Sequence, residues 1–316
     1  MPLALSDSLT LLGRWLQSTG YRFITVTPAT HERINARAQA RQAQDLRDVF
    51  GWSRPFAAEL LPPKALNWLH DTDLLRSDGA LWRSAVRFSS RGEQLYGHSA
   101  YPTADADAVF FGPDSYRFAA LIEAELTRRP ADAGMRILDI GCGAGPGGIA
   151  AALAAQAATP HLVLADINPR ALHYARANAA LAGLERVNCA QGDLFAAVEG
   201  QFDLIVANPP YLVDAAARTY RHGGGALGGG LSERIVSEGL PRLAPGGRLV
   251  LYTGAAMVGG ADPLLEAVRP VLHAAGWPFS YRELDPDVFG EELDSPAYAH
   301  AERIAAVALV TQRPAA

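Results

Sequence analysis

The chain has 316 residues, of which 49% are hydrophobic and 19% are charged, and its formal net charge is −5 at pH 7. This composition is typical of a globular protein with room for one large α/β domain and a smaller second one. No run of about 18 uncharged apolar residues is present, so no membrane span is expected. The acidic balance counts against a free-standing nucleic-acid binder, which would usually be basic.

The N-terminal stretch and the cysteines predict a cytoplasmic protein. MPLALSDSLTLLGRW has neither the basic n-region nor the Ala-x-Ala cleavage site of a signal peptide. Cys142 and Cys189 lie far apart in the chain, and we expect both to be free thiols in a reducing compartment. The eight histidines form no i,i+4 pair, so no metal site is predicted.

Residues 1–105 are expected to form a smaller α+β domain that recognises the substrate. Helices are predicted at 6–19, 28–50 and 62–70, and strands at 81–89 and 94–98, from apolar spacing and turn residues. Helices followed by a hairpin are compatible with a winged helix. Because this part of the chain is nearly neutral, such a unit would more often bind a substrate or mediate dimerisation than bind nucleic acid. The Pro-, Ala- and Asp-rich stretch 101–107 is the predicted linker.

Residues 106–316 alternate strands and helices. Strands are predicted at 136–140, 161–165, 187–190, 202–206, 248–252, 280–284 and 304–311, and helices at 115–128, 147–157, 169–181, 231–240 and 263–275. Such alternation predicts an α/β, Rossmann-like fold, in which a seven-stranded, mostly parallel sheet carries helices on both faces.

The first of these strands continues into the glycine-rich sequence RILDIGCGAGPGG. Gly141, Gly143 and Gly145 allow a sharp turn close to a ligand, and the following helix directs its N-terminus there. A nucleotide-like ligand is therefore expected at the carboxyl ends of the strands. Because Gly143-x-Gly145-x-x-Gly148 and an acid at Asp166 also satisfy the dinucleotide fingerprint, an NAD-binding oxidoreductase is one alternative.

The acid in front of these glycines resembles the pattern of class I S-adenosylmethionine-dependent methyltransferases. The matching residues are Asp139-Ile140-Gly141-Cys142-Gly143-Ala144-Gly145. The resemblance implies that Asp139 orients the cofactor's ammonium group and that Asp166 accepts its two ribose hydroxyls. It also implies that Asp193 accepts the adenine amino group, while the Leu194 N–H meets a ring nitrogen. The implied cofactor-binding residues are Asp139, Gly141, Cys142, Gly143, Gly145, Asp166, Ile167, Asp193, Leu194 and Asn208.

Asn208-Pro209-Pro210-Tyr211 ends the fourth strand and resembles the [Asn/Asp]-Pro-Pro-[Tyr/Phe/Trp] motif of methyltransferases that act on planar nitrogen. An amide or exocyclic amine is a poor nucleophile because its lone pair is delocalised. If the Asn208 side-chain oxygen and the Pro209 carbonyl accept its hydrogens, the lone pair is freed for attack. The prolines fix both acceptors in advance, and Tyr211 is expected to stack on the planar group. The oxidoreductase alternative does not account for this motif.

Residues from about 110 to 251 resemble the bacterial release-factor glutamine methyltransferases. The matching segments are DINPRALHYARANAALAG, FDLIVANPPY, YRHGGGALGGGLSERIV and RLAPGGRLVLYTG. The resemblance implies that the acceptor is a glutamine amide of a protein. The chain departs from that family at FFGPDSYRF, where the family carries Pro-Arg-Pro-x-Thr-Glu, and in its longer N-terminal region.

Several alternatives for the substrate stay open. RNA base methyltransferases, which act on exocyclic amines, and small-molecule N-methyltransferases share the Asn-Pro-Pro motif, so the partner is a protein or RNA held by the N-terminal domain, or a small molecule. A DNA adenine enzyme would need a large basic recognition domain. A winged-helix binding protein without catalysis is the alternative outside the class. The acidic segment 283–298 is either a solvated loop or a lid that favours a cationic substrate.

Overall fold

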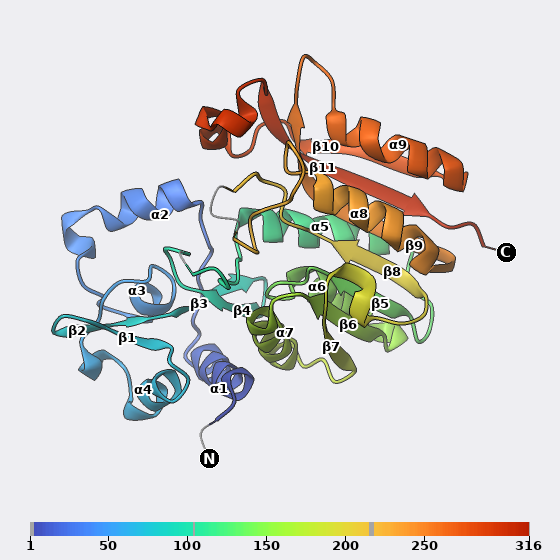
Figure 1. Cartoon of the computed structure of the whole chain (residues 1–316). Coiled ribbons are helices and arrows are strands. Elements are labelled where there is room, and N and C mark those ends of the chain that lie inside the picture. Colours follow the sequence, from blue (N-terminus) through green and yellow to red (C-terminus); the bar gives the residue numbers. More distant parts are fainter. Residues whose placement is uncertain (1–2, 104, 215–217, 316) are drawn as a thin grey trace.

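The structure is a computed structural model and describes residues 3–103, 105–214 and 218–315. Figure 1 shows a smaller N-terminal region of helices and hairpins beside a larger region built on one twisted sheet. A search of the described helices finds none that is long and apolar enough to cross a membrane.

The larger region contains the predicted seven-stranded sheet. Its strands are β5 (Arg136–Ile140), β6 (His161–Asp166), β7 (Val187–Gln191), β8 (Phe202–Ala207), β9 (Leu243–Met257), β10 (Phe279–Asp285) and β11 (Arg303–Gln312). Their order is β10-β11-β9-β8-β5-β6-β7. The strands from β9 to β7 run parallel, and β11 is antiparallel to both of its neighbours. The predicted fold class is confirmed.

Helices cover both faces of this sheet. They are α5 (Pro113–Arg128), α6 (Pro146–Ala154), α7 (Pro169–Leu181), α8 (Gly230–Gly239) and α9 (Pro263–Ala275). Alternate strand residues face opposite sides, so Ile137 belongs to the core under α5, α6 and α7, while Leu138 belongs to the core under α8 and α9. Hydrophobic cores therefore lie on both faces, as expected for parallel strands.

The N-terminal region differs from the prediction in three places. Its elements are α1 (Leu5–Ser18), α2 (Pro28–Asn35), α3 (Leu46–Phe50), α4 (Pro63–His70), β1 (Leu75–Asp78), β2 (Leu81–Ser84), β3 (Val86–Arg91) and β4 (Gln94–Ser99). The helix predicted over 28–50 is wrong, because Asp45 caps a separate helix by accepting a hydrogen bond from the Asp48 N–H. The strand predicted over 81–89 is two strands, because the Ser84 side chain bonds to the backbone of Val86 and interrupts it.

These two strands belong to separate hairpins. β2 pairs with β1, which was not predicted, and β3 pairs with β4. The predicted strand at 248–252 is likewise too short, since β11 pairs with β9 continuously from Arg248 to Met257. In both cases pairing with a distant strand, rather than local pattern, sets the length.

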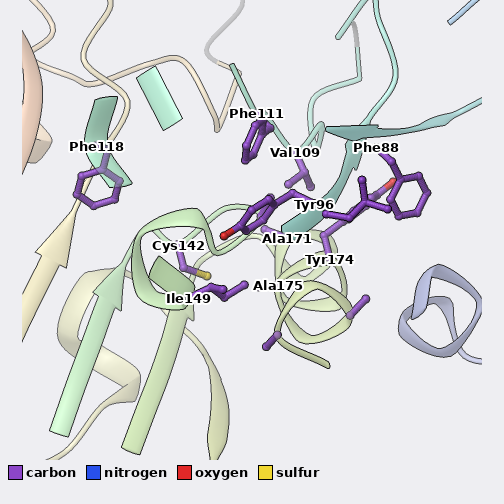
Figure 2. Packing of buried hydrophobic residues seen from close by; sticks show 14 of the residues in the cluster. Phe88, Tyr96, Val109, Phe111, Phe118, Cys142, Ile149, Ala171, Tyr174 and Ala175 are labelled. Atoms are coloured by element: carbon purple, nitrogen blue, oxygen red, sulfur yellow. The ribbon is translucent and has the colours of Figure 1, made fainter. Parts of the chain in front are cut away.

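The N-terminal region packs against α7. A Cβ atom at Gly13 of α1 would lie 2.5 Å from Leu181 Cδ1, so a larger residue there would require the Leu181 side chain to move. Figure 2 shows Phe88 and Tyr96 of the β3–β4 hairpin within one buried cluster that also contains Tyr174 and Cys142. The hairpin and the glycine loop therefore share one hydrophobic core.

Asn178 of α7 joins the hairpin to the glycine loop by hydrogen bonds. It is 1% exposed. Its Oδ1 accepts from the Gly97 N–H at 2.7 Å, and its Nδ2 donates to the Gly97 carbonyl at 3.0 Å and to the Ala144 carbonyl at 2.8 Å. One buried amide thus satisfies three backbone groups on two segments.

We expect Asn178→Leu to lower the free energy of unfolding by at least about 3 kcal/mol, because it leaves three backbone groups unsatisfied and each costs about 1–3 kcal/mol in the interior. Urea denaturation followed by circular dichroism measures this difference. Asn188→Leu, on the exposed side of β7, is the matched control and should change the free energy by less than about 0.5 kcal/mol. Equal effects of the two substitutions would contradict the role given to Asn178.

Candidate active site

The site begins with the register of two parallel strands. Ile140 at the end of β5 pairs with Ala207 at the end of β8. The next residues, Gly141 and Asn208, therefore leave the sheet at neighbouring positions on its carboxyl edge. The glycine loop and the Asn-Pro-Pro segment are brought together by this pairing.

The glycine loop needs its glycines for backbone conformation. Gly141, Gly143 and Gly145 have φ angles of +65°, +53° and +81°, in the left-handed region that favours glycine. A Cβ atom on Gly141 or Gly143 would meet nothing within 4 Å, so both face open space. Gly145 directly precedes α6 and packs against Ile149 instead.

Asp166, at the end of β6, holds this loop in place. Its Oδ2 accepts from the Gly143 N–H and its Oδ1 from the Asn168 N–H, both at 2.8 Å. Burial raises the pKa of Asp166 against the lowering effect of these donors. The Asn168 side chain, not Asp166, caps α7 by accepting from the Arg170 N–H. Each Asp166 oxygen keeps a lone pair for a ligand donor.

Asp139 lies beneath the loop and is 1% exposed. Its Oδ2 accepts from the Gly148 N–H at 2.7 Å, in the first turn of α6. Burial raises the pKa of Asp139 to about 7, although the Gly148 N–H acts to lower it. Gly148 itself cannot carry a side chain, because a Cβ atom there would lie 2.8 Å from Leu164 Cδ2 and 2.9 Å from the Asp139 Cβ.

These residues surround a cavity of about 290 Å³, which we call the cofactor cavity. Of the residues predicted to bind a cofactor, its walls include Asp139, Gly141, Cys142, Gly143, Asp166, Ile167, Asp193, Leu194 and Asn208, but not Gly145. The Asp193 carboxylate also pairs with Arg234 at 3.0 Å, where both side chains are about half exposed. Leu194 has a φ angle of +45°, and Ile167 is 54% exposed at the cavity wall.

The Asn208-Pro209-Pro210 segment is held from behind by the glycine-rich loop that follows it. A Cβ atom at Gly223 would lie 2.6 Å from the Pro210 carbonyl oxygen, and one at Gly228 would lie 2.2 Å from the Tyr211 carbonyl oxygen. Within the described parts of the chain, neither the Asn208 amide nor the Pro209 carbonyl has a hydrogen-bond partner. Both oxygens are therefore available to a ligand.

Tyr211 is anchored through its hydroxyl group, which donates to Asp114 Oδ2 at 2.5 Å. Asp114 is buried and also accepts from the Tyr252 hydroxyl at 2.7 Å and from Arg117 at 3.0 Å. Burial raises the pKa of Tyr211 well above its usual value, and the Asp114 charge adds to this effect. The Tyr211 ring packs so closely on β9 that a Cβ atom at Gly254 would lie 2.2 Å from it.

A second cavity of about 330 Å³, here called the acceptor cavity, lies on the other side of the motif. The two cavities share the wall residues Phe110, Asn208, Pro209, Pro210 and Tyr220. Thr27 and Pro28 of the N-terminal region and Phe289 of the acidic segment complete the acceptor cavity. The Asn-Pro-Pro segment is therefore the partition between two ligand-sized spaces.

Sequence reasoning missed Asp114, Tyr252, Phe110 and Tyr220. Tyr220 stacks on Phe110 with ring centroids 6.2 Å apart and donates to the Thr103 carbonyl at 2.8 Å. The segment FFGPDSYRF could have indicated two of them, because it contains Phe110 and Asp114 and stands where the release-factor glutamine methyltransferases carry Pro-Arg-Pro-x-Thr-Glu. Only the fold shows which distant side chains meet Asp114.

Comparison with known sequences gives matches across the larger region. Residues 119–268 match the family described as methyltransferase small domain. A release factor glutamine methyltransferase of Deinococcus radiodurans is 36% identical over 205 residues, which are 60% of this chain and 66% of that protein. A Koribacter versatilis protein of the same name is 34% identical over 47% of this chain and 56% of its own length. The chain thus spans less than two thirds of these relatives.

A ribosomal RNA small subunit methyltransferase C of Salmonella arizonae is 36% identical over 33% of this chain and 31% of its own length. Among solved structures, a proposed transferase of Pyrococcus horikoshii aligns with a TM-score of 0.50 at 11% identity, and this alignment covers 80% of this chain and 83% of that one. That structure supports the fold alone. The larger region is therefore similar, in sequence and in strand order, to the class I S-adenosylmethionine-dependent methyltransferases.

Proposed function

We propose that this protein transfers a methyl group from S-adenosylmethionine to a planar amide nitrogen, and that the acceptor is a glutamine side chain of a protein. The observation that carries the proposal is the partition of two cavities by Asn208, Pro209 and Pro210, whose free oxygens are the ones such a nitrogen needs. The relative from Deinococcus radiodurans, named for glutamine methylation, supports the choice of acceptor.

The residues of the cofactor cavity fit S-adenosylmethionine. The open space beside Gly141 and Gly143 leaves the loop backbone accessible, and Asp166 has lone pairs for a pair of hydroxyl donors. Asp139 offers a carboxylate to an ammonium group, and Asp193 with Leu194 would border the adenine. Bound there, the cofactor supplies an electrophilic methyl group on a sulfonium. Gly145 acts indirectly in this proposal, by shaping the turn into α6.

On the other side of the partition, the chain's own groups prepare the acceptor. Asn208 Oδ1 and the Pro209 carbonyl accept the two N–H hydrogens of the amide, which localises its lone pair on nitrogen. Their prolines keep this arrangement rigid before the acceptor arrives, so little ordering is needed. Tyr211 contributes a flat wall for the amide plane. No general base is required, since the nitrogen loses its proton after it has become charged.

We further propose that residues 1–105 recognise the substrate, that residues 106–316 form the methyltransferase domain, and that the protein works in the cytoplasm. Thr27 and Pro28 contribute to the acceptor cavity, which supports contact between the first region and the substrate. Methylation of an RNA base is the second candidate, supported by the likeness to a ribosomal RNA methyltransferase.

The test is to incubate the protein with methyl-labelled S-adenosylmethionine and a bacterial lysate, then to find the label in protein, RNA or small molecules. We expect label in protein, on a glutamine located by mass spectrometry. Purified bacterial release factors are the first defined substrates to try. Label confined to RNA or to small molecules would contradict the proposed acceptor.

Asn208→Ala should reduce the labelling rate by about 10²–10³-fold, the usual cost of losing one preorganised group at a transition state. Cofactor affinity, measured by calorimetry, should change little, because the remaining walls of the cofactor cavity are intact. Asn188→Ala on the exposed side of β7 is the matched control and should retain full activity. Undiminished labelling by Asn208→Ala would show that Asn208 does not bind the acceptor.

Gly143→Val should raise the calorimetric Kd for S-adenosylmethionine more than tenfold, because a β-branched residue resists a φ of +53° and its side chain would enter the cofactor cavity. Gly246→Val provides the control, since Gly246 has a φ of +79° but no contact with either cavity. If both variants bind the cofactor like the wild type, the glycine loop is not its binding site.

Cofactor affinity should rise with pH up to about 7 and then level off. Burial raises the pKa of Asp139 to about 7, so below that value the proton must leave before the carboxylate can pair with an ammonium group. Calorimetry between pH 5.5 and 7.5 measures this dependence. Asp139→Asn should bind more weakly and with a flatter pH profile; an unchanged profile would remove Asp139 from cofactor binding.

A further inference from the structure

A third, smaller cavity of about 30 Å³ lies between the N-terminal hairpin and the segment that enters the methyltransferase region. Its walls include Thr25, His31, Arg87 and His98. It shares Pro28, Thr103 and Phe110 with the acceptor cavity. We call it the side chamber, since it adjoins the space assigned to the acceptor.

Arg87 is a buried cation without a counter-charge. The residue is 5% exposed, and within the described ranges no carboxylate lies within salt-bridge distance of it. The hydrogen bonds of these ranges include one from its guanidinium, a long bond of 3.4 Å to the Thr25 hydroxyl, and its Nε has no partner. Tyr101, which also lines the chamber, donates its hydroxyl to Glu32.

A second buried arginine shows how this chain satisfies such a group elsewhere. Arg248 is also 5% exposed, but its two terminal nitrogens donate to the carbonyls of Glu125 and Arg129, each at 2.9 Å. Arg87 has no such carbonyl pair among the described residues. Arg87 instead lies over the Phe23 ring, with its Cζ 5.6 Å from the ring centroid, which supplies no negative charge. Since a buried charge without a counter-charge is costly, the difference points to an anionic partner from outside the described chain.

The other polar groups in and beside the side chamber supply no negative charge for Arg87 either. His98 and the hydroxyls of Ser89 and Thr25 bond to one another, and His98 Nδ1 lies 3.1 Å from the Ser99 carbonyl. His31 differs, because it is 1% exposed and, among the described residues, neither ring nitrogen has a partner with hydrogen-bond geometry, although the Trp52 backbone lies close enough to act on its pKa. Burial lowers the pKa of His31 to about 4, so its neutral ring offers one N–H donor at pH 7.

We propose that the side chamber binds a carboxylate, held by the Arg87 guanidinium and the His31 ring. A volume of about 30 Å³ holds about two water-sized atoms, as many as a carboxylate has oxygens. A guanidinium fork matches this planar group, and its charge would be neutralised in place. Burial lowers the pKa of Arg87 only to about 10, which leaves it charged at pH 7.

Because the side chamber adjoins the acceptor cavity, a carboxylate bound there can be part of the molecule that occupies the acceptor cavity. The site would therefore select acceptors that carry a carboxylate near the reacting nitrogen. This second step rests on the proposed function. The binding of a carboxylate to Arg87 does not, and can be tested without methyl transfer.

Formate is the probe. Titration of ¹³C-formate into the full-length protein, followed by NMR line width at constant ionic strength, should show saturable binding that an equal concentration of chloride does not displace. Arg87→Met should weaken this binding at least tenfold. Arg248→Met, the matched buried arginine, should leave the dissociation constant unchanged.

Non-saturable binding, equal displacement by chloride, or the same affinity in folded Arg87→Met would overturn the proposal. If Arg87→Met does not fold, His31→Phe keeps the arginine but fills the chamber, and unchanged formate binding by that variant would overturn it equally. In the methylation assay, inhibition by formate indicates that the carboxylate belongs to the substrate. Stimulation by formate indicates a separate small carboxylate as the occupant.

Discussion

The pairing of β5 with β8 is the constraint on which the site depends. It places Gly141 beside Asn208 at the edge of the sheet. The glycine loop, which leaves space for a ligand, and the rigid Asn-Pro-Pro segment therefore begin next to each other. The glycines supply φ angles that other residues resist, and the prolines remove the freedom of the facing backbone. A shift of one residue in this register would separate the two cavities from their common wall.

Asp114 extends this constraint into a network. Its carboxylate accepts hydrogen bonds from the hydroxyl groups of Tyr211 and Tyr252 and pairs with the guanidinium of Arg117. The other terminal nitrogen of Arg117 lies 2.8 Å from Asp285. Hydrogen bonds to a charged group are each worth about 1.5–3 kcal/mol, so the aromatic of the motif is held firmly. The acidic segment is thereby connected to the motif, and its Phe289 meets the Tyr211 ring edge-on at 5.8 Å.

The larger region could be predicted well wherever the chain carries local stop signals. The helix at 169–181 was predicted to the residue because Asn168 caps it and a proline starts it. The ends of α9 are likewise marked by local residues, Asp262 as the N-cap and Gly276 as the C-cap. Lengths set by distant pairing could not be predicted, as the long β9 shows. The role of Asp114 could not be predicted either, since its partners lie 97 and 138 residues away in sequence.

The sequence of the acidic segment allowed a negatively charged lid over the substrate, but several of its acids are neutralised by arginines. Asp285 pairs with Arg117, Glu292 with Arg221 and Glu283 with Arg303. Of the acids of that segment, only Asp287 and Glu291 line the cavity, and among the described residues neither forms an ion pair. These surface acids are screened by water, whereas a buried cation acts at low dielectric and over a short distance. If the side chamber binds a carboxylate as proposed, recognition of charge next to the acceptor cavity depends more on Arg87 than on the acidic segment.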